Sequence, residues 1–348
     1  MIIDVCGYCK EAEENSKRVI RHYLKYAHKQ ARVIIVGCLA QINPEALREF
    51  SRAAVIPHRE LSKLDCIIKA RTKFATIPKG VEVKKFPPLV GRDDYSPVRQ
   101  AENIFRVLEL KRNGLNKTIS DSPDKEFHVR VAQGCLGRCA YCAIKDVWGG
   151  LESRPLIKIK KEFRRCLDRG ADVVIIEAQD LGAYGQDIGT NIVALLEELF
   201  SCRGTYRLVL NDFNPQWLIR YFVKLKAIFR NTCDRVVYLN VPILSGSNRM
   251  LKLMNREYQI EDAERAIFEL KESSPELFIL SDIMLGFPGE TDRDFEMSKR
   301  FIKKLKSFKN TEPWITVYSD RPNTLASKMK MKVDSQEIKN RIAQLKKI

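Results

Sequence analysis

The 348-residue sequence has no apolar run near the ~20 residues that a membrane-spanning helix needs. Its first residues, MIIDVCGYCKEAEENS, also lack the basic start and apolar core of a signal peptide. We therefore expect a cytoplasmic protein with no membrane partner. Acidic residues are scarce beside basic ones, since 44 Asp and Glu face 61 Lys and Arg, a net charge of +17. So large an imbalance predicts a polyanionic partner, with RNA or DNA first.

A fourth metal ligand is missing from the segment VRVAQGCLGRCAYCAIKDVWGG, which carries Cys135, Cys139 and Cys142 in a C-x3-C-x2-C run. A structural zinc ion takes four protein ligands, and an ordinary four-iron cluster takes four thiolates. One alternative is zinc completed by His128 or a distant cysteine, and another is three unrelated buried thiols. We favour a cluster that leaves one iron open, where a small molecule occupies the vacant position.

Ten cysteines in an intracellular chain indicate metal or redox chemistry, because a reducing cytosol does not keep disulfides. Four of them have no motif around them and are predicted to be ordinary packed thiols: Cys66, Cys166, Cys202 and Cys233.

From residue 126 to residue 348 a buried strand followed by an amphipathic helix is repeated six times, without an internal sequence repeat. Val, Ile and Leu dominate the expected strands, as in buried parallel sheets; they are 126–134, 172–177, 206–212, 235–241, 277–287 and 314–319. Helices are expected at 191–200, at 291–306 with a capping box of Thr291 and Asp294, and at 335–348. The predicted fold class is α/β, a partial TIM-type (β/α)6 barrel.

Polar residues follow these strands where a barrel of this type carries its site, at the carboxyl ends. They include Glu177, Gln179, Asp180, Asn211 to Asn214, Asn240, Ser245, Asp282, Gly286, Tyr318 and Arg321.

Residues 1–90 predict a small open α/β domain before the barrel, and the polar stretch 91–125 predicts a linker. Strands are expected at 2–5 and 32–36, with helices at 11–29 and 44–52. Cys6 and Cys38 each end one of these strands, so their thiols could converge at one crevice, with Cys9 as a third. The alternative is a set of buried thiols without a metal.

The segment GCLGRCAYC resembles the CxxxCxxC loop of the radical S-adenosylmethionine (SAM) superfamily. That resemblance implies a 4Fe-4S cluster on Cys135, Cys139 and Cys142, whose open iron is chelated by the amino and carboxylate groups of SAM. The rest of the chain is similar to the methylthiotransferase branch, through segments in the family's order: DVCGYCKEAEENS, VIIVGCLAQ, GGLESRP, EAQDLGAYGQD, VPILSGSNRMLKLMNREY, SDIMLGFPGETDRDF and YSDRPNTLASKM.

The branch implies an auxiliary cluster on three cysteines of the amino-terminal domain. Cys6 and Cys38 match two of them, the first family cysteine would lie before Met1, and Cys9 is the candidate substitute. Other residues also depart from the family's pattern: Asp4-Val5 stands where the family has Asn-Thr, Asn240 where it has a His, and Leu244 where it has a Gln. The sequence ends at Ile348, where family members usually continue into a small β-barrel.

The resemblance implies that an electron from the loop cluster cleaves SAM, and that the resulting radical activates a carbon that receives a methylthio group. Implied partners are tRNA carrying threonylcarbamoyladenosine next to the anticodon and an electron donor such as flavodoxin or ferredoxin; we expect a monomer. Isopentenyladenosine and a ribosomal-protein aspartate are the other family acceptors. The rival functions are a one-cluster radical enzyme that has lost sulfur insertion, and a non-catalytic RNA-binding or iron-sensing protein.

Six residues near the loop are predicted to bind the cosubstrate. Tyr141 is expected beside the adenine, and Ser153 and Arg154 at a carboxylate. Gln179, Asp180 and Asn214 are expected at its polar atoms, with loop capping as the alternative role.

Overall fold

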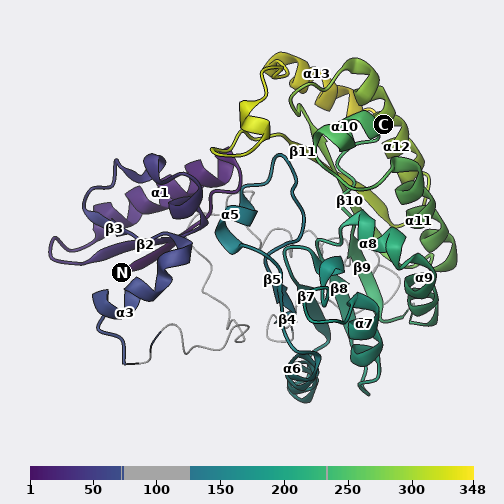
Figure 1. Cartoon of the computed structure of the whole chain (residues 1–348), viewed down its shortest axis with the longest axis horizontal. Coiled ribbons are helices and arrows are strands. Elements are labelled where there is room, and N and C mark those ends of the chain that lie inside the picture. Colours follow the sequence, from purple (N-terminus) through teal and green to yellow (C-terminus); the bar gives the residue numbers. More distant parts are fainter. Residues whose placement is uncertain (72, 74–125, 233) are drawn as a thin grey trace. The chain divides into compact units, whose positions relative to one another are not determined.

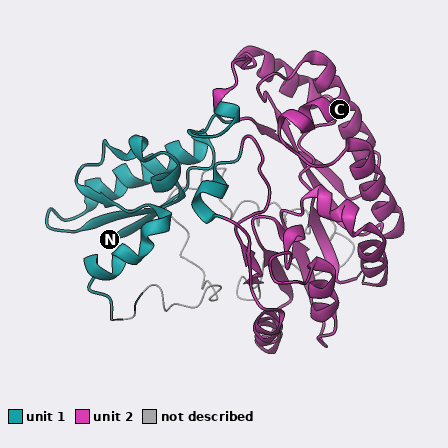
Figure 2. Cartoon of the chain, in the orientation of Figure 1, with its two compact units in different colours: residues 1–124, 142–149, 319–327 teal, residues 125–141, 150–318, 328–348 magenta. Residues whose placement is uncertain are grey.

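The computed structural model describes residues 1–71, 73, 126–232 and 234–348 (Figure 1). They form two compact units, coloured separately in Figure 2. Unit 1 comprises residues 1–124, 142–149 and 319–327, and unit 2 comprises residues 125–141, 150–318 and 328–348. The expected linker, 91–125, lies outside the described residues. Two short segments that we assigned to the barrel, 142–149 and 319–327, pack instead with unit 1.

Unit 2 contains a six-stranded sheet whose neighbouring strands are all parallel (Figure 1). The strands stand in chain order across the sheet: β4 (Glu126–Arg130), β7 (Val173–Glu177), β8 (Arg207–Leu210), β9 (Val236–Asn240), β10 (Phe278–Leu285) and β11 (Thr311–Val317). A parallel sheet in chain order requires a crossover after each strand, as in a barrel wound in one direction. The prediction of six β/α units is confirmed.

Helices separate the strands of unit 2: α6 (Leu156–Asp168), α7 (Ile192–Phe200), α8 (Pro215–Arg220), α9 (Phe222–Asn231), α10 (Asn248–Leu253), α11 (Ile260–Ser273), α12 (Asp292–Lys306) and α13 (Ser335–Leu345). Their apolar residues contribute to the core; α7, for example, buries Ile192, Leu195, Leu196 and Leu199. A short antiparallel pair, β5 (Ala132–Gln133) and β6 (Glu152–Ser153), flanks the cysteine loop, and a 3-10 turn, η7 (Leu181–Ala183), follows β7.

The predicted capping box at the start of α12 is present. The Thr291 hydroxyl accepts the Asp294 amide at 3.4 Å, and the Asp294 carboxylate accepts the Thr291 amide at 2.9 Å. Asp294 also accepts the Ser247 hydroxyl at 2.6 Å and pairs with Arg249, both next to or in α10. This buried carboxylate therefore ties α12 to α10 as well as capping its own helix.

Unit 1 is a three-stranded parallel sheet in the order β1 (Ile2–Val5), β2 (Val33–Gly37), β3 (Ala53–Val55). Its helices are α1 (Lys10–Tyr26), α2 (Cys38–Ile42), α3 (Leu64–Ile67) and α5 (Ile144–Trp148), with 3-10 turns η1 (Pro44–Leu47) and η2 (His58–Lys63). The predicted helix 44–52 is wrong: only 44–47 is helical, because Leu47 and Phe50 both turn into the core before β3. The predicted helix 11–29 ends earlier, at Tyr26.

The cysteines without a motif behave differently from one another. Cys166 and Cys202 are 2% exposed, as predicted for packed thiols. Cys66, in α3, is exposed, so its predicted packing is wrong. Cys233 lies outside the described residues.

Candidate functional site

The loop that carries the three clustered cysteines begins where β5 ends, and glycines shape it. Gly134, at φ +76°, donates its N–H to Gln179 Oε1 at 2.8 Å, which fixes the start of the loop to the end of β7. Gly137 donates its N–H to Cys135 Sγ at 3.1 Å. A Cβ at position 137 would lie 3.3 Å from Cys135 Sγ and 3.7 Å from Cys139 Sγ. The two sulfurs therefore flank a glycine that leaves room between them.

Cys142 follows Cys139 by three residues, so the chain holds it within about 10 Å of that residue, and it is half-buried. Within the described residues, no three His, Cys, Asp or Glu side chains meet closely enough to hold a single metal ion. A four-iron cluster distributes its thiolates over different irons, so its ligands need not meet at one point. The loop's three partly accessible thiols, spaced around a glycine, fit that donor set.

Asp180 lies next to Cys135 and has an unused oxygen. Its Oδ2 accepts the Trp217 indole N–H at 3.0 Å and stands 4.0 Å from Cys135 Sγ. Its Oδ1 is buried and has no hydrogen-bond partner within the described part of the chain. Burial raises the pKa of this carboxyl, an effect that hydrogen bonding by Trp217 and the charge of Arg256 partly offset. A buried acceptor left open in this way fits a cationic or hydrogen-donating ligand.

Arg256 joins the loop to the neighbouring strand ends, and the sequence analysis missed it. Its Nη1 donates to Cys139 Sγ at 3.5 Å and to the Tyr141 hydroxyl at 3.4 Å. Its Nη2 donates to Asn214 Oδ1 at 3.1 Å and to the Pro242 carbonyl at 2.9 Å. Nothing local marks this arginine among 61 basic residues, because only the fold brings it to the cysteine loop.

The six residues predicted to bind the cosubstrate fall into two groups. Gln179, Asp180, Asn214 and Tyr141 all connect, directly or through Arg256, to the cysteine loop. Asn214 is also the N-cap of α8, accepting the Gln216 amide at 3.4 Å, so the capping role that we gave as its alternative is present.

Ser153 and Arg154 are engaged within the fold instead. The Ser153 hydroxyl accepts the Gly185 amide at 2.8 Å. The Arg154 guanidinium pairs with the Glu162 carboxylate and donates to the Arg130 carbonyl. The carboxylate that the Arg154 guanidinium binds in the structure therefore belongs to Glu162 of the same chain.

Further carboxylates follow the next strands of the sheet. Glu177 at the end of β7 contacts His128 Nδ1 at 2.6 Å, and Asp282 in β10 accepts the Asn240 amide at 2.6 Å. Desolvation by the surrounding protein, followed by the charges of Asp282, Asp180 and Glu177, raises the pKa of Asp212 to about 7, although this residue is exposed to solvent. The four carboxyl groups therefore form an acidic cluster, contributed by the ends of β7 and β8 and by β10, beside the cysteine loop.

A second set of thiols lies in unit 1, at the carboxyl edge of its sheet. In the parallel register Val5 pairs with Gly37, and Cys6 and Cys38 are the residues that follow this pair. Cys9 is the N-cap of α1, and its Sγ accepts the Ala12 amide at 3.4 Å. Burial is the main cause that raises the pKa of Cys38 to about 12, with the Cys6 charge next. Desolvation by the surrounding protein also raises the pKa of Cys6, and the Cys9 charge adds to it, although Cys6 is exposed to solvent.

Two glycines allow these thiols to approach one another. Gly37 has φ +106°, and a Cβ there would lie 2.1 Å from Asp4 Oδ1 and 2.5 Å from the Val5 carbonyl oxygen. A Cβ at Gly7, between Cys6 and Cys9, would lie 2.8 Å from Leu39 Cα. The backbone of the CGYC segment therefore runs directly against the residue after Cys38, and the predicted convergence of Cys6, Cys9 and Cys38 has a geometric basis.

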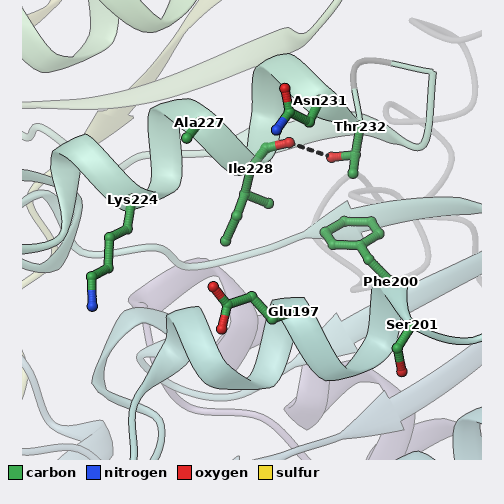
Figure 3. A pocket seen from close by; sticks show the side chains of 8 residues that line it. All are labelled: Glu197, Phe200, Ser201, Lys224, Ala227, Ile228, Asn231 and Thr232. Atoms are coloured by element: carbon green, nitrogen blue, oxygen red, sulfur yellow. Dashed lines mark hydrogen bonds between the residues drawn. The ribbon is translucent and has the colours of Figure 1, made fainter.

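Two pockets of unit 2 lie away from the cysteines themselves. One, of about 550 Å³, lies between α7 and α9 and is lined by Glu197, Phe200, Lys224 and Ile228 among others (Figure 3). Its Thr232 hydroxyl is already bonded to the Ile228 carbonyl at 2.8 Å. The other, of about 670 Å³, is lined by residues of α8, α10 and the start of α11 and by Arg256. Neither pocket contains a thiol or a cluster of titratable groups suited to catalysis.

Residues 129–302, half of the chain, match the model of the radical SAM superfamily. The chain belongs to the radical SAM superfamily. Membership makes it an enzyme whose cofactors are a 4Fe-4S cluster and SAM, as predicted, and it accounts for a three-cysteine loop without a fourth protein ligand. In the described residues no helix is both long and apolar enough to cross a membrane.

Curated relatives of the chain carry methylthiotransferase names. A "probable threonylcarbamoyladenosine tRNA methylthiotransferase" of Pyrococcus horikoshii is 29% identical over 337 residues, covering 95% of this chain and 70% of the relative. The human threonylcarbamoyladenosine tRNA methylthiotransferase is 26% identical over all of this chain and 55% of its own length. A ribosomal protein uS12 methylthiotransferase, RimO of Protochlamydia amoebophila, is 27% identical over 95% of this chain and 66% of its own length. The chain is thus similar to radical SAM methylthiotransferases along nearly its whole length.

Solved structures support the fold. The radical SAM methyltransferase TsrM from Kitasatospora setae, at 15% identity, superposes with a TM-score of 0.59 over 93% of this chain and 63% of its own. The radical SAM enzyme OxsB, at 11% identity, gives a TM-score of 0.55 over 99% of this chain and 47% of its own. The predicted partial barrel preceded by a small α/β unit is confirmed at the level of fold.

Proposed function

We propose that the protein transfers a methylthio group to a modified adenosine of tRNA, N6-threonylcarbamoyladenosine next to the anticodon. One observation carries this proposal beyond the superfamily. Three further thiols, on Cys6, Cys9 and Cys38, follow the carboxyl edge of the unit 1 sheet or cap α1 beside it, in segments of the sequence remote from the cysteine loop. An enzyme that only cleaves SAM needs one cluster, whereas sulfur insertion needs a second site that can carry sulfur.

Cys135, Cys139 and Cys142 would hold the loop cluster, which supplies, when bound, the electron that cleaves SAM. Cys6, Cys38 and Cys9 would hold the auxiliary cluster. The thiols of Cys6 and Cys38 have raised pKa values, so iron itself must supply the positive charge that keeps them as thiolates.

The chain's own residues would bind and orient the cosubstrate. The buried, open Oδ1 of Asp180 offers an acceptor for the positively charged amino group of SAM, close to Cys135. Gln179 holds the loop in place through Gly134, and Arg256 fixes the Tyr141 hydroxyl. The buried strands beneath them exclude water from the radical's path.

Two features favour tRNA as acceptor. The net charge of +17 suits a polyanion, and several of the most similar relatives carry tRNA methylthiotransferase names. A ribosomal protein remains the second candidate, since RimO proteins are nearly as similar. We further propose that a flavodoxin or ferredoxin reduces the loop cluster and that the protein is a monomer.

Mass spectrometry of nucleosides tests the acceptor. Anaerobically reconstituted protein, SAM, a reductant and tRNA carrying threonylcarbamoyladenosine should yield the methylthio derivative of that nucleoside. The Cys38→Ala variant is the control, and it should cleave SAM without forming this product. A methylthio group on ribosomal protein uS12 and none on tRNA, in a parallel incubation, would replace the proposed acceptor. No transfer to either, with SAM still cleaved, would favour the one-cluster enzyme.

A further inference from the structure

The contact between Arg256 and Cys139 has no place in the roles assigned so far. The guanidinium makes four hydrogen bonds within unit 2, to Cys139 Sγ, the Tyr141 hydroxyl, Asn214 Oδ1 and the Pro242 carbonyl. None of these four acceptors is a carboxylate. The guanidinium is thus held by neutral groups of the loop and of two strand ends, and one of its N–H groups is directed at a cysteine of the loop. Its charge also acts on the Asp180 and Asp282 carboxyl groups.

The position of this guanidinium is well defined. Asn214 is buried and is itself fixed as the N-cap of α8, and Pro242 follows β9. The Arg256 guanidinium also lies over the Tyr258 ring, 5.4 Å from its centroid. The amide of Asn255, the preceding residue, donates to the Arg138 carbonyl at 2.7 Å, so the segment is tied to the loop at a second point. Arginine keeps its charge at every physiological pH, and its planar fork loses little entropy in such a site.

A fixed cation beside a cluster sulfur has a predictable consequence. Reduction adds one negative charge to the cluster, and a positive charge a few ångströms away stabilises that reduced state. Hydrogen bonds to cluster sulfurs and local charge are among the factors that set iron–sulfur reduction potentials. Because the site lies among buried strand ends, solvent screens this interaction only partly.

We propose that Arg256 raises the reduction potential of the loop cluster by donating a charged hydrogen bond to the Cys139 thiolate. The inference rests on the proposed function only in assuming that Cys135, Cys139 and Cys142 hold a cluster. Arg256 acts through Cys139 and is therefore a positioning and tuning residue. Its effect is to make the cluster easier to reduce by a one-electron donor of the ferredoxin or flavodoxin class.

A redox titration tests this without SAM or tRNA. The full chain with Cys6→Ala and Cys38→Ala serves as parent, so that the loop cluster alone is observed. Midpoint potentials are measured by electron paramagnetic resonance after anaerobic reconstitution, for the parent and for added Arg256→Met, Arg256→Gln and Arg256→Lys. Lys252→Met is the matched control, because Lys252 is an exposed cation four residues earlier in the chain.

We expect Arg256→Met to lower the ratio of reduced to oxidised cluster at least tenfold at a fixed potential, a shift of about 59 mV for one electron. Arg256→Lys, which keeps the charge, should recover part of that shift, with Arg256→Gln between Lys and Met. Lys252→Met should leave the midpoint unchanged.

A midpoint in Arg256→Met equal to that of the parent, with the same iron content, would overturn the inference. Loss of iron from both the Met and Gln variants would also overturn it, since Arg256 would then serve cluster retention. A parent without iron on the cysteine loop would overturn this inference and the proposed function together. An unchanged potential in these variants, while the chain with Cys6 and Cys38 intact still modifies tRNA, would overturn this inference alone.

Discussion

The two groups of cysteines are built in opposite ways. Cys135, Cys139 and Cys142 lie within eight residues of sequence, with Asp180 of unit 2 next to the first sulfur and Arg256 directed at the second. Cys6 and Cys38 are 32 residues apart and meet only because two parallel strands end side by side. Their charged neighbours are each other, Cys9 and Asp4, all acidic groups. One site is prepared electrostatically for a reduced cluster, whereas the other depends on the metal for its positive charge.

The largest expected effects come from cysteine substitutions that separate the two sites. Cys139→Ala should abolish SAM cleavage, because the loop would keep only two thiolates. Cys38→Ala should retain SAM cleavage and abolish methylthio transfer. Production of 5′-deoxyadenosine and of modified nucleoside, measured in the same incubations, distinguishes them. If Cys38→Ala lost both activities while keeping the loop iron, the two sites would not be separable as described.

A glycine substitution should disrupt only the candidate site of Cys6, Cys9 and Cys38. Gly37→Ala introduces a Cβ at φ +106° that clashes with Asp4 and with the Val5 carbonyl, and should destabilise β1–β2 pairing by about 3 kcal/mol. Hydrogen exchange of β2 peptides measures this loss, with β7 peptides unchanged. Gly170→Ala is the control, since φ is +79° there but no atom lies within 4 Å, and it should cost only about 1 kcal/mol. Equal exchange of β2 in both variants would contradict the close approach.

Asp294 should stabilise unit 2 in a pH-dependent way. Burial opposes its ionisation, yet hydrogen bonds from Arg249, Ser247 and Thr291 lower its pKa below the ordinary value of 3.8. Its contribution is therefore complete above that value and is lost as the pH falls toward the lower folded pKa. Asp294→Asn should cost about 2 kcal/mol at pH 7 in urea unfolding, and the difference should shrink below pH 4.

The control for Asp294→Asn is Asp262→Asn, because Asp262 forms an exposed pair with Arg265 in α11. That substitution should change the unfolding free energy by less than about 0.5 kcal/mol. A pH-independent cost in Asp294→Asn would show that packing, and not charge, carries its role.

The smallest expected effect concerns Asp212, in the acidic cluster, because this residue is exposed and solvent screens its charge. Desolvation by the surrounding protein and three neighbouring carboxylates raise its pKa to about 7, so the folded state binds a proton more tightly than the unfolded chain. Stability therefore falls as the pH rises from about 4 through 7. Asp212→Asn, which tolerates the φ of +53°, should raise the urea midpoint at pH 8 slightly and not at pH 4. A lower midpoint at pH 8 would contradict this account.

The sequence predicted the barrel well for a physical reason. Central strands of unit 2 such as β7 and β8 are short runs of Val, Ile and Leu, and the helices between the strands carry recognisable caps such as Asn191 and Thr291. Unit 1 was predicted less well, because β3 has only three residues and the predicted helix 44–52 is mostly a turn.

Some residues of the candidate site could likewise be predicted from the sequence, and others could not. Spacing alone marks Cys135, Cys139 and Cys142, since a loop holds neighbours in sequence together. The approach of Cys38 to Cys6 depends on strand register and on the bare backbone at Gly37. Arg256 could not be selected from sequence, because its partners come from three separate segments of the chain. Arg154 was selected because its guanidinium can bind a carboxylate, and in the structure it binds the carboxylate of Glu162.

The most direct test of the central claim, that the chain holds two separate iron–sulfur sites, is the iron and sulfide content per chain after anaerobic reconstitution. The account predicts about eight irons in the wild-type protein and about four in the Cys6→Ala, Cys38→Ala double variant. About four irons in both proteins would contradict it. The cysteine loop would then hold the chain's one cluster, and the enzyme would be a radical SAM protein without sulfur insertion.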